Sequence, residues 1–89
     1  MKINNQKSTL CIFSFETGDS SCPYYDVSVL VYGEVNRKSI MEKLNVFGIE
    51  DLEYEDIVEE SLNALGYEHE PVGILDKKFN IDGILMIHY

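Results

Sequence analysis

The sequence predicts an α+β fold in which an antiparallel four-stranded sheet carries two helices on one face, in the order β-β-α-α-β-β. Two runs of β-forming residues come first, two stretches with helical spacing of apolar residues follow, and two further β-type runs end the chain. Because strands and helices are grouped rather than alternating, we expect an antiparallel sheet with segregated helices. The 89 residues should form one domain, 1–89, in which the polar residues 1–7 are flexible.

The first two strands are predicted to form a hairpin. The run Thr9–Phe15 carries apolar side chains on both faces, which favours an interior or doubly covered strand. Residues 16–23 are a loop by their Gly, Asp, Ser and Pro content. In the second strand, 24–35, alternation places a row of valines on one face: Val27, Val29, Val31 and Val35. Tyr24 and Tyr25 are adjacent and must face opposite ways, so one of them should be exposed.

A short helix is predicted over Arg37–Asn45, with Asn36 as its N-cap and Gly48 at its end. Its apolar positions are Ile40, Met41 and Leu44. Arg37 and Lys38 lie in the first turn, where cations oppose the helix dipole. They either pair with a nearby carboxylate or form a small basic contact patch.

The most informative stretch is a second predicted helix, 50–66, whose outer side is almost entirely carboxylate. At about 100° per residue, its apolar side comprises Tyr54, Ile57, Val58, Ser61, Leu62, Ala64 and Leu65. Its polar side comprises Glu53, Glu55, Asp56, Glu59, Glu60 and Asn63. Asp51 is the expected N-cap, and Gly66 lies where a left-handed C-cap residue is favoured.

The carboxylates of this helix repel one another. Like charges four residues apart, such as Glu55 and Glu59, destabilise a helix by roughly 0.2–0.5 kcal/mol per pair. No Lys or Arg lies between Lys43 and Lys77 to offset them. The carboxylates of Glu53–Glu60 are spread over about 10 Å, or about one charge per 2 Å, which is close to the ~1.7 Å charge spacing of duplex DNA. The face can imitate a phosphate backbone, or it only keeps an acidic protein in solution.

The last two strands are less regular. Residues 67–75 are predicted to form a strand in which Pro71 marks an edge or an irregular start. A turn follows at 76–80. The final run Ile84–Tyr89 is strongly apolar, and it should be central in the sheet, covered, or paired with another chain, because an exposed edge of this kind would aggregate.

The formal net charge of −9 argues against direct binding of nucleic acid or of an anionic membrane, because both require Lys and Arg. It favours a basic protein partner and electrostatic steering of the encounter. The first residues lack the apolar segment of a signal peptide, and no apolar run approaches the roughly 18 residues of a membrane span. We expect a cytoplasmic location, in a bacterial host cell if the protein is phage-encoded.

Neither a metal site nor a catalytic centre is predicted. Two cysteines are too few for a disulfide scaffold; Cys11 should be buried, and Cys22 should be the more exposed thiol. Together with His69 and His88 they lack the close ligand spacing of zinc sites. Phosphate-binding glycine loops, nucleophile elbows and His-Glu-x-x-His helices are missing from the sequence. We therefore expect no cofactor and no enzymatic activity.

In size, charge, lack of enzymatic motifs and the acidic run Glu50–Glu60, the chain resembles small phage-encoded inhibitors such as anti-CRISPR proteins, uracil-DNA glycosylase inhibitors and other nucleic-acid mimics. The resemblance implies a non-enzymatic inhibitor that occupies the basic groove of a nucleic-acid-binding protein. The predicted partner-binding residues are Glu50, Asp51, Glu53, Glu55, Asp56, Glu59, Glu60, Tyr24, Tyr25, Glu68 and Glu70. The alternative is a structural or assembly subunit that forms a homodimer through Ile84–Tyr89.

Overall fold

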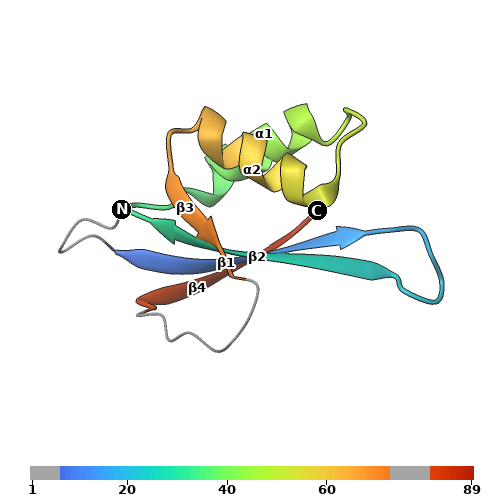
Figure 1. Ribbon diagram of the computed structural model, residues 1–89, viewed down its shortest axis with the longest axis horizontal. Coiled ribbons are helices and arrows are strands. Elements are labelled where there is room, and N and C mark those ends of the chain that lie inside the picture. The colour runs from blue at the N-terminus through green and yellow to red at the C-terminus, as the bar shows by residue number, and fades with distance from the viewer. Residues whose placement is uncertain (1–6, 73–80) are drawn as a thin grey trace.

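The computed structural model describes residues 7–72 and 81–89. Its elements are β1 (Ser8–Glu16), β2 (Tyr24–Tyr32), α1 (Arg37–Phe47), α2 (Tyr54–Ala64), β3 (Glu68–Pro71) and β4 (Gly83–His88). Figure 1 shows both helices on one face of the four-stranded sheet. The predicted α+β class, with a four-stranded sheet and two helices, is confirmed. The flexible segment predicted at 1–7, apart from Lys7, residues 73–75 of the strand predicted at 67–75, and the turn predicted at 76–80 lie outside the described residues.

The sheet is mixed, so the prediction of a purely antiparallel sheet is wrong. Its strand order is β3-β2-β1-β4, in which β2 is antiparallel to both neighbours and β4 is parallel to β1. The prediction assumed that consecutive strands are neighbours, which is the usual case. Here β3 and β4 lie at opposite edges, so their connection is a crossover and both strands run in the direction of β1. The apolar last strand is therefore an edge strand rather than a central one.

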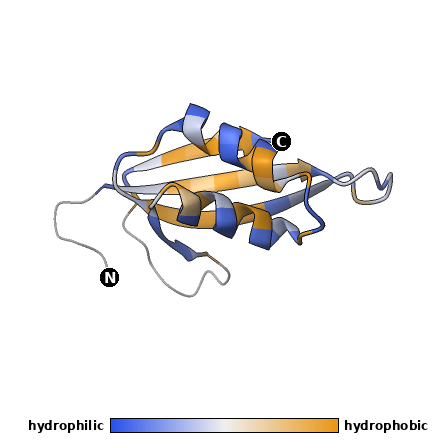
Figure 2. Ribbon diagram, turned by 90° about the horizontal axis from the view of Figure 1, so that it is seen from above, coloured by the Kyte–Doolittle hydropathy of each residue, from blue (hydrophilic) through white to orange (hydrophobic). Residues whose placement is uncertain are grey.

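The hydrophobic core lies between the helices and the sheet. The sheet contributes Cys11, Phe13, Phe15, Val27, Val29, Val31 and Ile87. The helices contribute Ile40, Leu44, Ile57, Val58 and Leu62. Figure 2 shows the helices lying across a hydrophobic band of strands. The alternation predicted for β2 and the helical spacing predicted for α1 and α2 are confirmed by this core, although β2 ends at Tyr32 and Val35 packs from the segment that follows.

The predicted flanking residues of the first helix, Asn36 and Gly48, are confirmed, although the helix runs to Phe47 rather than to Asn45. The Asn36 side chain caps α1 by accepting a hydrogen bond from the Ser39 backbone N–H at 3.0 Å. Gly48 ends the helix with a φ of −68°, which is not the left-handed conformation that favours glycine. A Cβ at this position would lie 2.6 Å from the Leu44 carbonyl oxygen and 2.8 Å from Cζ of Tyr89. Glycine is therefore required here by close packing.

The second helix begins later than predicted. Its N-cap is Glu53, which makes no side-chain capping bond, so the prediction of Asp51 as the N-cap is wrong. The reason is the turn after α1, in which the Glu50 N–H bonds to the Phe47 carbonyl oxygen at 3.2 Å. At the other end, a φ of +78° at Gly66 confirms the predicted left-handed residue.

Arg37 reaches from the first turn of α1 to the outer edge of β4. The Tyr89 N–H donates to the Ser14 carbonyl oxygen at 2.9 Å, and the Tyr89 carbonyl oxygen accepts from the Glu16 N–H at 3.3 Å. Odd-numbered residues of this strand thus direct their backbone groups toward β1, and even-numbered residues direct theirs outward. The Arg37 Nη2 donates to the outward carbonyl oxygen of Met86 at 2.8 Å. Neither sequence-based explanation of this cation included a bond to the sheet edge.

Candidate partner-binding surface

Five carboxylates lie on the outer side of α2 and at its N-cap. Glu53, Glu55, Asp56, Glu59 and Glu60 are all exposed, and they are called the acidic face below. The opposite side of the helix, with Ile57, Val58, Ser61 and Leu62, is buried. The predicted division into a polar and an apolar side is confirmed, except that Ala64 is exposed. The burial of one side fixes which way the carboxylates point.

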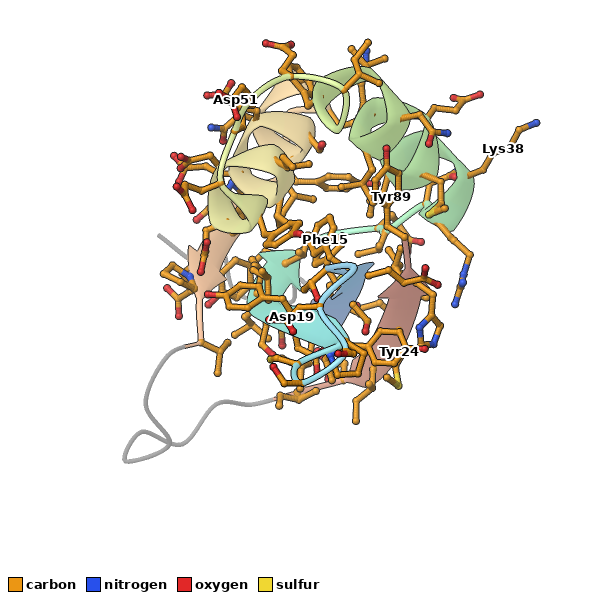
Figure 3. The ribbon with its side chains drawn as sticks, turned by 90° about the vertical axis from the view of Figure 1, so that its right-hand side faces the viewer. Phe15, Asp19, Tyr24, Lys38, Asp51 and Tyr89 are labelled. Atoms are coloured by element: carbon orange, nitrogen blue, oxygen red, sulfur yellow. The ribbon has the colours of Figure 1, made fainter. Side chains whose placement is uncertain are left out.

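Glu50 and Asp51 extend the negative charge beyond the helix. Both side chains are exposed in the segment between α1 and α2. Figure 3 shows Asp51 on the helical side of the molecule, away from the sheet. These charges precede the N-terminus of α2, where the helix dipole stabilises anions. They belong to the same surface as the acidic face but are held by a turn instead of by the helix.

Tyr25 is joined to the acidic face. Its hydroxyl donates a hydrogen bond to Oε2 of Glu55. This bond is the main cause that raises the pKa of Tyr25 and lowers the pKa of Glu55. The Tyr25 ring stacks on Tyr54 with centroids 5.3 Å apart, and Tyr54 stacks on the buried Phe15 at 4.8 Å. Tyr25 is therefore anchored to the core through aromatic contacts and to α2 through its hydroxyl.

Tyr24 lies on the other face of the sheet. Its partner in the register is Glu16, whereas Tyr25 is opposite Phe15. Figure 3 shows Tyr24 on the side of the sheet away from the helices and Phe15 on the side toward them. The sequence predicted that one of the two tyrosines is exposed, but both are: Tyr24 is 57% and Tyr25 39% exposed. Tyr25 therefore lies beside the acidic face, whereas Tyr24 lies on the opposite face of the sheet.

Glu68 and Glu70 also face away from the helices. The register of β3 with β2 sets Glu68 opposite Tyr32 and Glu70 opposite Leu30, and these positions alternate with the core valines. Burial and then the hydrogen bond to Glu70 raise the pKa of the Tyr32 hydroxyl. The predicted grouping of these two glutamates with the helix carboxylates is therefore corrected, because strand alternation directs them to the opposite face.

A groove that the sequence did not predict lies between the first half of β2, the end of β3, and α2. One hollow of about 100 Å³ is lined by Val27, Val29, Glu55, Val58, Glu59, His69 and Pro71. A second hollow of about 350 Å³ is lined by Tyr25, Asp26, Val27, Ser28, Glu55, Pro71 and Val72. The hollows share three residues, Val27, Glu55 and Pro71, and are together called the β2–α2 groove. No local sequence signal predicts it, because it depends on how far β3 extends along β2.

The two cysteines occupy the environments that the sequence predicts. Cys11 is buried in the core and Cys22 is exposed in the β1–β2 loop, and both are free thiols. Burial raises the pKa of the Cys11 thiol to about 11. Within residues 7–72 and 81–89, no group of His, Cys, Asp and Glu is arranged to hold a metal ion. In the same ranges, neither helix is long and apolar enough to cross a membrane.

Comparison with protein families, with curated proteins and with solved structures finds no match to this chain. The function must therefore be argued from the surface itself, since a fold of this class hosts many unrelated functions. The acidic face with Tyr25 and the adjoining β2–α2 groove together form the most distinctive surface of the described residues.

Proposed function

We propose that the protein is a non-enzymatic acidic binding protein, an inhibitor that occupies the basic nucleic-acid-binding groove of a partner protein. The observation that carries the proposal is that all five carboxylates of the acidic face are exposed on one side of a packed helix. They offer about one charge per 2 Å, near the ~1.7 Å spacing along duplex DNA. The groove of a partner protein that binds a phosphate backbone would find a similar row of negative charges on the acidic face.

The acidic face is preorganised, which supports a role in binding. Its helix is anchored by Ile57, Val58 and Leu62, which are at most 4% exposed. Tyr25 holds Glu55 in addition. Charges on a packed helix lose less backbone entropy on association than charges on a flexible tail. The helix tolerates the repulsion between carboxylates because its buried side supplies the stabilisation.

The charge distribution supports a cationic partner. The net charge is −9, and no Lys or Arg lies between Lys43 and Lys77. A single-sign surface attracts an oppositely charged groove over a distance and accelerates association, most strongly at low ionic strength. Binding through the acidic face should therefore weaken steeply with salt.

A capture experiment tests the proposal. Immobilised wild type should retain a basic nucleic-acid-binding protein from host lysate at low salt, and added duplex DNA should release it. A variant with Asp56→Asn, Glu59→Gln and Glu60→Gln should lose this partner. The matched control is Glu16→Gln with Glu34→Gln and Glu42→Gln, which removes the same charge from exposed positions outside the acidic face. Equal retention by both variants, or no release by DNA, contradicts the proposal.

The alternative, an assembly subunit that self-associates through its last strand, is favoured by one observation. β4 is an edge strand, and Ile84 and Met86 on it are 66% and 47% exposed. In the described part of the chain no strand pairs with its outer edge, and exposed edges of this kind pair with other chains. The alternative is weakened because Arg37 already donates a hydrogen bond to the Met86 carbonyl oxygen on this edge. Light scattering at micromolar concentration decides, because a monomer excludes the homodimer.

A further inference from the structure

β3 covers only part of the outer edge of β2. Its pairing runs from Tyr32 to Val29, and the last bond in this line among the described residues is from the Val72 N–H to the Ser28 carbonyl oxygen at 3.1 Å. The first residues of β2, from Tyr24 to Val27, pair with β1 on one side. In the described parts of the chain, no strand pairs with them on the other side. Among the described residues, the edge of β2 is thus unpaired before Ser28, where the line of β3 stops.

Backbone alternation shows which groups this edge presents. The Gly33 N–H bonds to the Lys7 carbonyl oxygen at 2.8 Å, and the Pro23 carbonyl oxygen accepts from the Thr17 N–H at 3.0 Å. Odd-numbered residues on this side of the hairpin therefore face β1, and even-numbered residues face the line of β3. The N–H and C=O of Asp26 point to the open edge. These are the groups with which an added strand would pair.

The β2–α2 groove lies directly above this edge. Its floor is apolar, with Val27, Val29 and Val58, and Pro71 closes it at the end of β3. Glu55 and Glu59 of α2 supply its charged wall. No Lys or Arg lines either hollow. A long side chain with an aliphatic stem and a positive end matches this combination.

We propose that the β2–α2 groove binds an extended, lysine- or arginine-bearing segment of the partner, which adds a strand to β2 at Asp26 in line with β3. The partner residue opposite Val27 then points toward the helices, because paired residues in a sheet share a face. Its stem packs on Val27 and Pro71, and its charge reaches Glu55 or Glu59. This inference rests on the proposed function, since it names the part of a basic partner that the acidic protein recognises.

A second copy of this chain is a poorer occupant. Each copy carries a net charge of −9, so a strand from another copy would bring further negative charge to a wall formed by Glu55 and Glu59. A basic segment instead compensates that wall while it satisfies the backbone groups of Asp26. Main-chain pairing supplies affinity in such complexes, and the side-chain pocket supplies specificity.

The test uses the full chain and a capped octapeptide of alternating lysine and valine at low salt. Amide hydrogen exchange should show new protection of the Asp26 N–H when the peptide binds. Asp26→Pro should weaken binding about tenfold relative to Asp26→Ala, because both remove the charge but only proline removes the edge N–H. Proline is tolerated at a strand position whose N–H points outward. Circular dichroism of both variants confirms that they fold.

Equal affinity of the two Asp26 variants, or an unprotected Asp26 amide in the complex, overturns strand addition. The proposed function survives that result if the variant with Asp56→Asn, Glu59→Gln and Glu60→Gln still loses its captured partner. If that variant keeps the partner while the two Asp26 variants differ in affinity for the peptide, the acidic face is not the binding surface. Strand addition at Asp26 is still supported by that result. A peptide in which glutamate replaces lysine should not bind, and equal binding by it would overturn the basic specificity.

Discussion

The Tyr25 hydroxyl donates a hydrogen bond to the Glu55 carboxylate and so connects β2 to the acidic face. The contact raises the pKa of Tyr25 above its usual 10.0 and lowers the pKa of Glu55 below its usual 4.5. Both shifts favour the state with a protonated tyrosine and an ionised glutamate. One charge of the acidic face is therefore fixed in position throughout the neutral pH range.

Replacing Tyr25 with Phe should return the pKa of Glu55 toward 4.5. Since the folded pKa of Glu55 is depressed, the contact stabilises the fold above pH 4.5, and this contribution is lost as the pH falls through the folded pKa. The difference in free energy of unfolding between wild type and variant should shrink over the same window. An NMR titration of the Glu55 carboxyl carbon measures the shift. Tyr24→Phe, on the opposite face, is the control and should leave the titration unchanged.

The two thiols should differ sharply in reactivity. Burial raises the pKa of Cys11 to about 11, so its thiolate is scarce at pH values near 8 as well as shielded from reagents. Cys22 is exposed. A chromogenic disulfide reagent should modify one thiol per folded chain and both thiols in urea. Cys22→Ser should abolish the fast reaction, and rapid modification of Cys11 in that folded variant would contradict its burial.

Local features of this molecule were predictable because they depend on residues close together in sequence. The Asn36 cap, the left-handed Gly66 and the exposed carboxylates of α2 each follow from a short pattern. The start of α2 was misplaced because Asp51 is a good capping residue in isolation. The competing backbone bond from Glu50 to Phe47 belongs to the end of the preceding helix, which the capping pattern does not include.

Features that depend on strand order were not predictable. A periodic apolar run such as Ile84–Tyr89 indicates a strand but does not say which neighbour it pairs with or in which direction. Its place beside β1, parallel and at the edge, follows from a crossover. The pairing of β3 with β2 likewise stops, among the described residues, before it reaches Asp26, and Glu55 of α2 lines the hollow there. The acidic face was therefore predicted from the sequence, whereas the groove beside it required the fold.

Gly48 should resist substitution although its backbone is ordinary. An added Cβ would meet the Tyr89 ring and the Leu44 carbonyl oxygen, the latter at 2.6 Å, and a backbone atom cannot move aside easily. Gly48→Ala should therefore lower the free energy of unfolding by about 1–3 kcal/mol, as overpacking usually does. Urea denaturation measures the change. Asn45→Ala, at an exposed position of α1, is the control and should change stability by less than about 0.5 kcal/mol.

Arg37 should protect the protein from self-association. Its guanidinium donates to the outward Met86 carbonyl oxygen at 2.8 Å, and so occupies an acceptor that a second chain would need for pairing along β4. Arg37→Ala frees this acceptor beside the exposed Ile84, so light scattering should report dimers or larger species at concentrations where wild type is a monomer. Lys38→Ala removes the same charge from the neighbouring exposed residue and should remain monomeric.

Adding Ile84→Lys to Arg37→Ala should restore the monomer, because a charged side chain on an edge strand opposes pairing. If Arg37→Ala stays monomeric, the contact between Arg37 and Met86 does not prevent pairing along β4, and another feature does so.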